Sequence, residues 1–271
     1  MEPALQDLAS TNLSLKFNLR RARQKVEDFL GMNREIKQAF ARKEKEGLSD
    51  IPVFIISFDR LSCLKVLIEG LEQVGLTNIH IIDNASTYPP LLKYYKETPY
   101  DVIYMQENFG SRVFWKSEVF DKYRNDFYIV TDSDLELLPE CPGDLAEFLF
   151  NLLKKFHFVR KAGISLKIDD IPEDSILGAD VKQWESQFFK APIKGEGAYY
   201  ASVDTTLAMY LPDNLAKGIP FLRAIRSAHP YQARHLPWYK TKETLTSEDE
   251  YYSVSRSNGW WGIAEGKITP D

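Results

Sequence analysis

From Ile51 onward, short apolar runs alternate with segments whose apolar residues recur at helical spacing. The runs predict buried strands over 52–58, 78–83, 100–105, 127–131, 162–168 and 199–210, and the periodic segments predict helices over 61–74, 91–96, 113–123, 144–158 and 181–190. Strands that alternate with helices are typical of a mostly parallel sheet covered by helices. The pattern therefore predicts an α/β fold.

Residues 1–48 carry a different pattern. Apolar residues such as Phe29, Ile36 and Phe40 recur at mostly helical spacing among many lysines, arginines and glutamates. They predict an N-terminal extension of one or two amphipathic helices, with a linker at 44–50. Three roles stay open for it: packing on the main domain, packing on a second subunit in a homodimer, or, because 20–25 is basic, contact with a membrane surface.

Polar residues stand where each of the first four predicted strands ends. They are Ser57 and Asp59, then Asp83 and Asn84, then Asn108 and Gly110, then Asp132, Ser133 and Asp134. The carboxyl ends of parallel strands meet at one edge of the sheet, which is where open α/β sheets bind ligands. We therefore expect these side chains to converge on one binding site.

Asp132 and Asp134 have the chemistry of a metal site. Alternate residues of an extended backbone share a face, so the two carboxylates point the same way and suit Mg²⁺ or Mn²⁺ that bridges phosphate oxygens. An isolated Asp-x-Asp is otherwise a solvated turn, and the polar ends of the other strands favour the metal site here. The chain lacks the glycine-rich Rossmann and P-loop motifs, which predicts that phosphates are held by the metal.

Other residues at this edge suit a nucleotide. Asp83 can accept a hydrogen bond from a base N–H, and Gly110 lets the backbone approach a ribose or phosphate. Arg60 and Arg112 are candidates to neutralise a diphosphate. The alternatives are a simple turn at Asp83 and surface ion pairs for the arginines.

Composition limits the function further. The 271 residues are 44% hydrophobic and 27% charged, as in an ordinary globular protein, and two cysteines give neither a disulfide framework nor a zinc cluster. A net charge of -5 argues against nucleic-acid binding. The start does not resemble a signal peptide, and no apolar run approaches the roughly 18 residues of a membrane span. We expect a cytoplasmic protein, with at most peripheral contact at the inner membrane face.

Four segments, Pro52–Arg60, Ile81–Ser86, Asn108–Gly110 and Val130–Asp134, resemble in this order the nucleotide-sugar-dependent glycosyltransferases of the GT-A fold, and family 2 most. The resemblance implies a Rossmann-like GT-A sheet, a nucleotide-sugar donor that is most often a UDP sugar, and Mn²⁺ or Mg²⁺ as cofactor. It places Asp83 at the nucleobase. Asp132 and Asp134 become the family's DXD motif, which contacts the metal and the ribose or diphosphate.

The family 2 resemblance covers about residues 50–170, and the later part of the chain departs from that family's usual pattern of a Glu-Asp pair before a helix. For the second half, the implied roles come from the wider resemblance to GT-A enzymes. It implies that His235 completes the metal site, that Arg226 or Arg234 contacts the phosphates, and that an acceptor-side carboxylate is the general base. The candidates for the base are Asp204, Asp169 and Asp170. Asp204 stands inside the predicted strand 199–210, where an acid needs a partner or a function. The stretch 226–239, which is interrupted by prolines, is predicted to be a loop.

This interpretation divides the chain into a helical extension over 1–48, a catalytic domain over 49–240 and a tail or lid over 241–271. The domain has a nucleotide-sugar-binding half over 49–160 and an acceptor half over 161–240. We predict a hexosyltransferase that acts on a glycan or lipid-linked sugar acceptor in polysaccharide biosynthesis.

Three alternatives stay open. A sugar-nucleotide pyrophosphorylase has a similar sheet but normally an early glycine-rich loop. A haloacid-dehalogenase phosphatase has an Asp-x-Asp that continues with Thr, where Glu136 stands here. The third is a non-catalytic protein that binds nucleotides or glycans.

Overall fold

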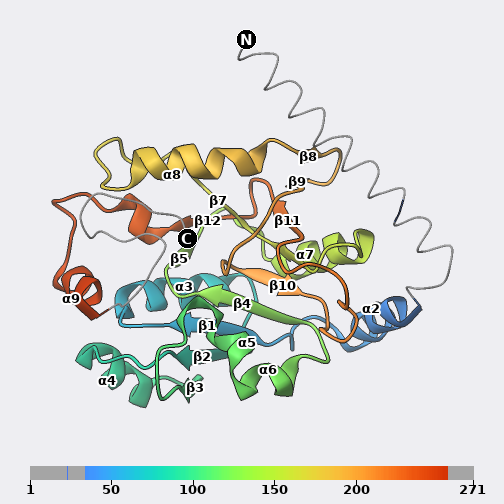
Figure 1. The fold of residues 1–271 in the computed structure, drawn as a ribbon, viewed down its shortest axis with the longest axis horizontal. Coiled ribbons are helices and arrows are strands. Elements are labelled where there is room, and N and C mark those ends of the chain that lie inside the picture. The colour runs from blue at the N-terminus through green and yellow to red at the C-terminus, as the bar shows by residue number, and fades with distance from the viewer. Residues whose placement is uncertain (1–22, 24–33, 256–271) are drawn as a thin grey trace, which may run out of the picture.

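The computed structural model describes residue 23 and residues 34–255, and a nine-stranded sheet lies at its centre (Figure 1). In order across the sheet, the strands are β3 (Asp101–Tyr104), β2 (Ile79–Asp83), β1 (Val53–Ser57), β4 (Tyr128–Asp132), β10 (Ala208–Tyr210), β6 (Lys161–Gly163), β11 (Ala224–Ser227), β9 (Ala198–Tyr199) and β8 (Pro192–Ile193). Only β10 and β9 run against the common direction. The predicted α/β class with a mostly parallel sheet is confirmed.

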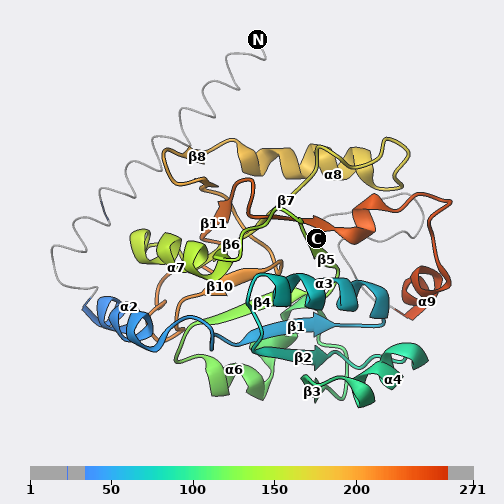
Figure 2. The same ribbon diagram turned by 180° about the vertical axis from the view of Figure 1, so that it is seen from behind.

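Helices cover both faces of this sheet (Figures 1 and 2). The first core lies under α2 (Arg34–Glu46), α3 (Leu61–Gln73) and α7 (Leu145–Lys155), and the second lies under α5 (Val113–Lys116) and α6 (Glu118–Tyr123). Along β1, Val53 and Ile55 enter the first core while Phe54 and Ile56 enter the second. A strand buried on both faces is apolar throughout, which is why its sequence shows a continuous apolar run.

A second, three-stranded sheet holds β12 (Gln232–His235) between β5 (Leu135–Leu137) and β7 (Ser165–Leu166). The prediction of a loop over 226–239 is therefore wrong, since this stretch contains the end of β11, all of β12 and a 3-10 turn, η3 (Leu236–Tyr239). Local composition did not reveal β12, because its pairing partners are distant in the sequence.

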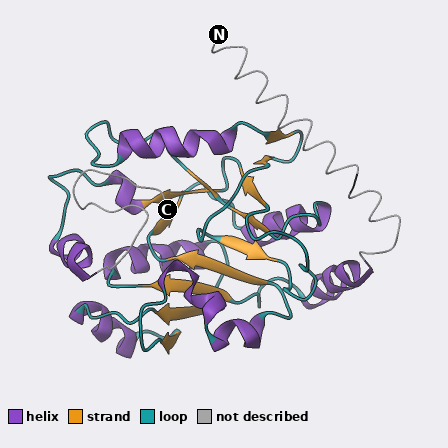
Figure 3. Cartoon of the chain, in the orientation of Figure 1, coloured by secondary structure: helices purple, strands orange, loops and turns teal. Residues whose placement is uncertain are grey.

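The other elements can be followed in Figure 3. They are α4 (Pro89–Glu97), η1 (Gly110–Arg112), α8 (Gly178–Glu185), η2 (Ser186–Phe189) and α9 (Ser247–Ser255). The strand predicted over 199–210 is wrong, because β9 ends at Tyr199 and residues 200–207 form a loop before β10. The predicted strand 162–168 is divided between β6 and β7, which belong to different sheets. The predicted helix 113–123 is interrupted at Ser117.

The N-terminal extension is described only from α2 onward, apart from residue 23. Ile36 and Phe40 are buried, and the ring of Phe40 contacts those of Phe127 and Phe150 in the first core. Thus α2 packs on the main domain, which is the first of its three predicted roles. The remaining predicted helix lies outside the described residues. Within the described part of the chain, no helix has the length and apolarity needed to span a membrane.

Candidate active site

The predicted Asp-x-Asp lies where the two sheets meet. The main sheet's β4 ends at Asp132 and the small sheet's β5 begins at Leu135, with Ser133 and Asp134 between them. Since β12 pairs with β5, His235 lies opposite Leu135 and next to Asp134. Strand pairing therefore brings together two predicted metal ligands that are far apart in the sequence.

The carboxylate of Asp134 lies between the guanidinium of Arg60 and the imidazole of His235. Its Oδ2 is 3.1 Å from Nη1 of Arg60, and its Oδ1 is 3.3 Å from Nε2 of His235. All three side chains are largely buried, with exposures of 7% for Arg60, 13% for His235 and 16% for Asp134. Burial lowers the pKa of His235, although the charge of Asp134 opposes the shift. A neutral imidazole is the form that binds metals.

Three buried polar atoms of this cluster have no hydrogen-bond partner: Oδ1 of Asp134, Nδ1 of His235 and Nε of Arg60. Leaving a buried polar atom unpaired costs about 1–3 kcal/mol, and native proteins keep few such atoms. Three at one place indicate a site that is completed by something other than the protein's own side chains.

The donor atoms fit a divalent cation. Neighbouring ligands of an octahedral ion at about 2.1 Å lie about 3 Å apart, and Oδ1 of Asp134 and Nε2 of His235 are 3.3 Å apart without a hydrogen bond between them. Carboxylate and imidazole together suit Mn²⁺. Arg60 pairs with the other oxygen, so it leaves Oδ1 available. The described residues contain no group of three or more His, Cys, Asp or Glu side chains arranged to hold a metal ion.

Asp132 faces the loop that precedes β10. Its Oδ2 accepts a 2.7 Å hydrogen bond from Oγ1 of Thr205, in the loop before β10. Burial and the neighbouring charge of Asp134 raise the pKa of Asp132, and the bond from Thr205 opposes this shift. Sequence reasoning missed Thr205, because only the folded loop brings its hydroxyl to Asp132.

Ser57 and Asp83 lie opposite each other at the ends of β1 and β2. Asp83 is 3% exposed, and its Oδ1 accepts the N–H of Ser86 at 3.1 Å. Burial raises the pKa of Asp83, and the hydrogen bonds from Ser86 oppose the shift. Oγ of Ser57 accepts a 2.9 Å hydrogen bond from the hydroxyl of Tyr95. Both residues thus stand at the predicted edge of the sheet.

Asp59 ties two loops together. Its backbone has a φ of 48°, in the left-handed region, and its Oδ1 accepts the N–H groups of Thr87 at 2.6 Å and Tyr88 at 2.8 Å. The residue is completely buried. Asp59 was predicted to bind the donor, and in the structure its carboxylate fixes the loop after β1 to the loop after β2.

Asn84 organises the next pair of loops. Its Nδ2 donates to Oδ1 of Asn108 at 2.8 Å and to the carbonyl of Gly110 at 3.2 Å, and its Oδ1 accepts the N–H of Phe109 at 2.9 Å. Gly110 has a φ of 72°, which glycine adopts without strain. These three predicted residues lie together after β2 and β3.

Arg112 and Arg226 have different surroundings. Arg112 is exposed, and its guanidinium lies 5.2 Å from the ring centre of Phe221. Arg226 is buried, and its Nη1 donates to Oε2 of Glu185 at 2.5 Å. The guanidinium of Arg226 therefore already has a protein carboxylate as its partner.

Arg234, Asp169 and Asp170 form a separate network of ion pairs. Nη2 of Arg234 donates to Oδ2 of Asp170 at 2.8 Å, and Nη1 donates to Oε2 of Glu136 at 3.2 Å. Asp169 pairs with Lys167 at 2.7 Å. In this structure, the carboxylates of these two candidate bases thus have cationic partners, and the guanidinium of Arg234 contacts two acids.

Asp204 lies in the loop over 200–207, and it is exposed to solvent. The prediction that it stands within a strand is wrong, because β10 begins only at Ala208. An exposed carboxylate needs no buried partner. Its charge still contributes to the raised pKa of Asp132, so the two acids lie near each other. Of the three predicted bases, Asp204 is the one whose loop contacts the Asp-x-Asp.

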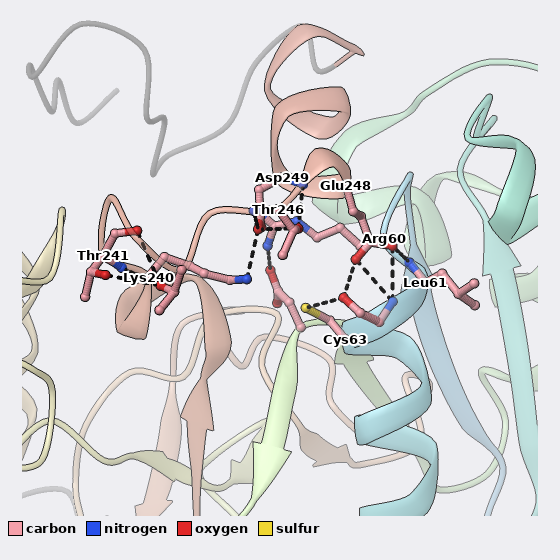
Figure 4. Close-up of polar contacts among 11 residues, drawn as sticks. Arg60, Leu61, Cys63, Lys240, Thr241, Thr246, Glu248 and Asp249 are labelled. Atoms are coloured by element: carbon pink, nitrogen blue, oxygen red, sulfur yellow. Dashed lines mark hydrogen bonds and ion pairs between the residues drawn. The ribbon is translucent and has the colours of Figure 1, made fainter.

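The helix α9 folds back onto the start of α3, as Figure 4 shows. No side chain at the N-cap position of α3 satisfies its first N–H groups, and Glu248 of α9 does so instead. Its Oε1 accepts the N–H of Leu61 at 2.7 Å and that of Ser62 at 3.2 Å. The ring of Tyr252 lies 3.8 Å from the guanidinium carbon of Arg60. The predicted tail thus contacts Arg60, although whether it acts as a lid stays a prediction.

We expect Glu248→Gln to lower the free energy of unfolding by about 1–2 kcal/mol, because the variant loses a charge at a helix N-terminus and charged hydrogen bonds to it. Urea denaturation measures the change. Glu250→Gln in the same helix is the control, since Glu250 is exposed. Equal effects of the two substitutions would contradict the docking role of Glu248.

No protein-family model matches the chain, and no curated protein matches its sequence. Solved structures do match. TarS of S. aureus is 14% identical with a TM-score of 0.40, over 75% of this chain and 38% of TarS, so the chain spans well under half of that protein. Glucosyl-3-phosphoglycerate synthase of Mycobacterium tuberculosis, in complex with Mn²⁺ and UDP-glucose, is 12% identical with a TM-score of 0.43, over 81% of this chain and 79% of that one.

A UDP-glucose pyrophosphorylase complexed with UDP-glucose is 10% identical with a TM-score of 0.43, over 76% of this chain and 99% of that one. These matches accord with the predicted resemblance to GT-A-type enzymes, but their TM-scores of 0.40–0.43 and identities of 10–14% carry no conclusion about the family or the substrate of this chain.

Proposed function

We propose that this protein is a metal-dependent glycosyltransferase, of the hexosyltransferase type, that uses a nucleotide-sugar donor, with a UDP sugar as the first candidate. The acceptor we propose is a glycan or a lipid-linked sugar. The observation that carries the proposal is the cluster of Arg60, Asp134 and His235, in which three buried polar atoms lack hydrogen-bond partners at the carboxyl edge of the sheet. Such a cluster suits a cation and a diphosphate.

The donor's nucleoside would lie along the ends of β1 and β2. There Asp83 is buried with an oxygen that can accept a hydrogen bond from a base N–H, next to Ser57. The tied loops that carry Asn84 and Gly110 stand beside them and would contact the ribose. Arg60, which has an unpaired Nε, would donate to the diphosphate.

Asp134 and His235 would hold the metal ion. Asp132 would become a further ligand only if its carboxylate turned toward the ion, because the described residues contain no preformed group of three such ligands. When bound, such an ion stabilises the negative charge that develops on the leaving diphosphate. The chain's own contribution is to keep the imidazole of His235 neutral by burial and to orient Asp134 through its ion pair with Arg60.

Asp204 is the proposed general base. Its exposed carboxylate lies in the loop that contacts Asp132, so it can meet an acceptor that arrives from solvent. It would take the proton from the acceptor hydroxyl as that oxygen attacks the anomeric carbon. The products are then the glycosylated acceptor and a nucleoside diphosphate.

Calorimetric titration tests this proposal, with UDP, GDP and CMP each added with and without Mn²⁺. We expect one nucleotide to bind only with the metal, and we expect His235→Ala to weaken that binding by about 10–100-fold, since it loses a direct ligand. His229→Ala is the matched control, because His229 is an exposed histidine in the same part of the chain.

The nucleotide that binds decides which sugar donors are screened next for transfer. If no nucleotide binds to the wild-type protein under any condition, the proposed function is wrong. If His229→Ala weakens binding as much as His235→Ala does, the metal site is not the one described above.

A further inference from the structure

We propose that Lys161 is a positioning residue for this active site: its buried side-chain nitrogen fixes the backbone of the loop 200–207, and that loop in turn holds Asp132 through Thr205. The inference rests on the proposed function for its effect on ligand binding. Its effect on the loop is independent of that function.

Lys161 is an unusual residue for its position. It begins β6 in the main sheet, and it is completely buried. Its Nζ donates to the carbonyl oxygen of Asp204 at 2.9 Å and to the hydroxyl of Tyr210 at 3.1 Å, and it lies 4.2 Å from the ring centre of Phe221. None of these partners is a carboxylate. A lysine is seldom fully buried, and least often without a paired acid.

The same loop is held at two further points. Nε of Arg226 donates to the carbonyl of Ser202, while the other end of this guanidinium is paired with Glu185 in α8. Oγ1 of Thr205 donates to Oδ2 of Asp132. The buried side chains of Lys161 and Arg226 therefore donate to two backbone carbonyls of the loop, and Thr205, the residue next to Asp204, donates to the carboxylate of Asp132.

These three hydrogen bonds explain how a loop without regular secondary structure holds Asp204 and Thr205 in fixed positions at the site. Residues 200–207 form no strand or helix, so no ladder of backbone hydrogen bonds fixes them. The buried Nζ of Lys161 instead supplies one hydrogen-bond donor to the carbonyl of Asp204. Loss of that bond should free both Thr205 and the carboxylate of Asp204.

Because Lys161 is buried without a paired acid, we expect it to lower the stability of the fold while serving the function of the site. Burial lowers the pKa of Lys161 to about 7, against the opposing charge of Asp204. The other groups that act on it are Asp132, Arg160, Arg226 and Tyr210. Replacement of a buried charge by a well-packed apolar side chain is often neutral or stabilising. A residue kept despite that cost is more simply explained by a role in the site than by one in the core.

The test compares Lys161→Met with the wild type. Hydrogen exchange, read by mass spectrometry on peptides over 201–207, should become about tenfold faster in the variant, because the hydrogen bond from Nζ to the loop is lost. Affinity for UDP with Mn²⁺ should fall by about tenfold, in the range of residues that orient metal ligands. The unfolding temperature at pH 7 should not fall.

Two further variants make the result specific. Lys182→Met is the matched control, since Lys182 also donates to a backbone carbonyl, that of Ile171, at 2.8 Å, but lies in α8. It should leave the loop's exchange and the affinity unchanged. Thr205→Val should reproduce the weaker affinity while the hydrogen bond from Lys161 to the loop remains.

A pH series gives an independent readout. Between about pH 7 and the unfolded-state pKa of about 10.4, the unfolded chain binds a proton that Lys161 has already released in the folded protein. The stability of the wild type should therefore rise with pH relative to Lys161→Met across this window.

Unchanged exchange in 201–207 would overturn the proposal, and so would an unfolding temperature of Lys161→Met below that of the wild type, which would make Lys161 a core residue. If the wild type binds no nucleotide, the proposed function fails, and the exchange measurement alone decides the role of Lys161.

Discussion

Asp134→Asn is expected to abolish metal-dependent nucleotide binding and to lower sugar transfer by about 10³-fold or more, because it removes the charged ligand of the proposed ion and several kcal/mol of transition-state stabilisation. Asn keeps the shape of Asp, so the side chain still fits between Arg60 and His235. Calorimetry with UDP and Mn²⁺ measures the binding, and transfer assays with the donor identified by the screen measure the rate.

The substitution has a second effect that must be separated from the first. It leaves the buried guanidinium of Arg60 without its acid, and an unpaired buried charge costs about 3–5 kcal/mol. Arg60→Met with Asp134→Asn removes both charges and should recover much of the stability. Chemical denaturation of the two variants measures this. If binding returns together with stability in the double variant, Asp134 is a structural residue and not a metal ligand.

Asp204→Asn is expected to lower the turnover number by about 10²–10⁴-fold, the usual contribution of a general base, while the affinity for UDP with Mn²⁺ stays within about twofold of the wild type. The reason is geometric: the carboxylate of Asp204 is exposed to solvent, and it is Thr205 that contacts Asp132. Steady-state kinetics with saturating donor measure the first quantity, and calorimetry measures the second.

Asp169→Asn and Asp170→Asn are the comparisons for this experiment. In the structure their carboxylates pair with Lys167 and Arg234, so we expect smaller losses of turnover than for Asp204→Asn. A loss of turnover confined to one of these two variants would move the base to that residue. Equal, small losses in all three would show that none of the three carboxylates is the base.

Much of the fold of residues 49–160 was predictable because its signals are local. The apolar runs of β1 and β4 are continuous because both faces of each strand are buried, and β2 has the same character apart from His80; this pattern can be read without a structure. The polar residues that follow them converge because parallel strands end at one edge. Asp83, Asp132 and Asp134 stand at that edge as expected.

Residues 161–240 were predicted less well, because their strands are short and pair over long distances. Residues 199–210 look like one strand, yet they contain the ends of two strands and the loop that carries Asp204 and Thr205. Residues 226–239 look like a loop, yet β12 runs through them because β5 and β7 offer it partners on both sides. Local β-strand propensity carries no information about pairing partners that are distant in the sequence.

By itself, the sequence determined the α/β class, the edge of the sheet that carries the acids, and the chemical types that a metal and a diphosphate require, since these follow from local pattern and side-chain chemistry. Only the tertiary structure decided which charged side chains pair with each other. It paired Asp134 with Arg60 and His235, gave Arg234 two acids as partners, used Asp59 to tie two loops and placed a buried lysine under the loop of Asp204. These contacts depend on strand register and loop path, which are set by pairing between distant segments of the chain.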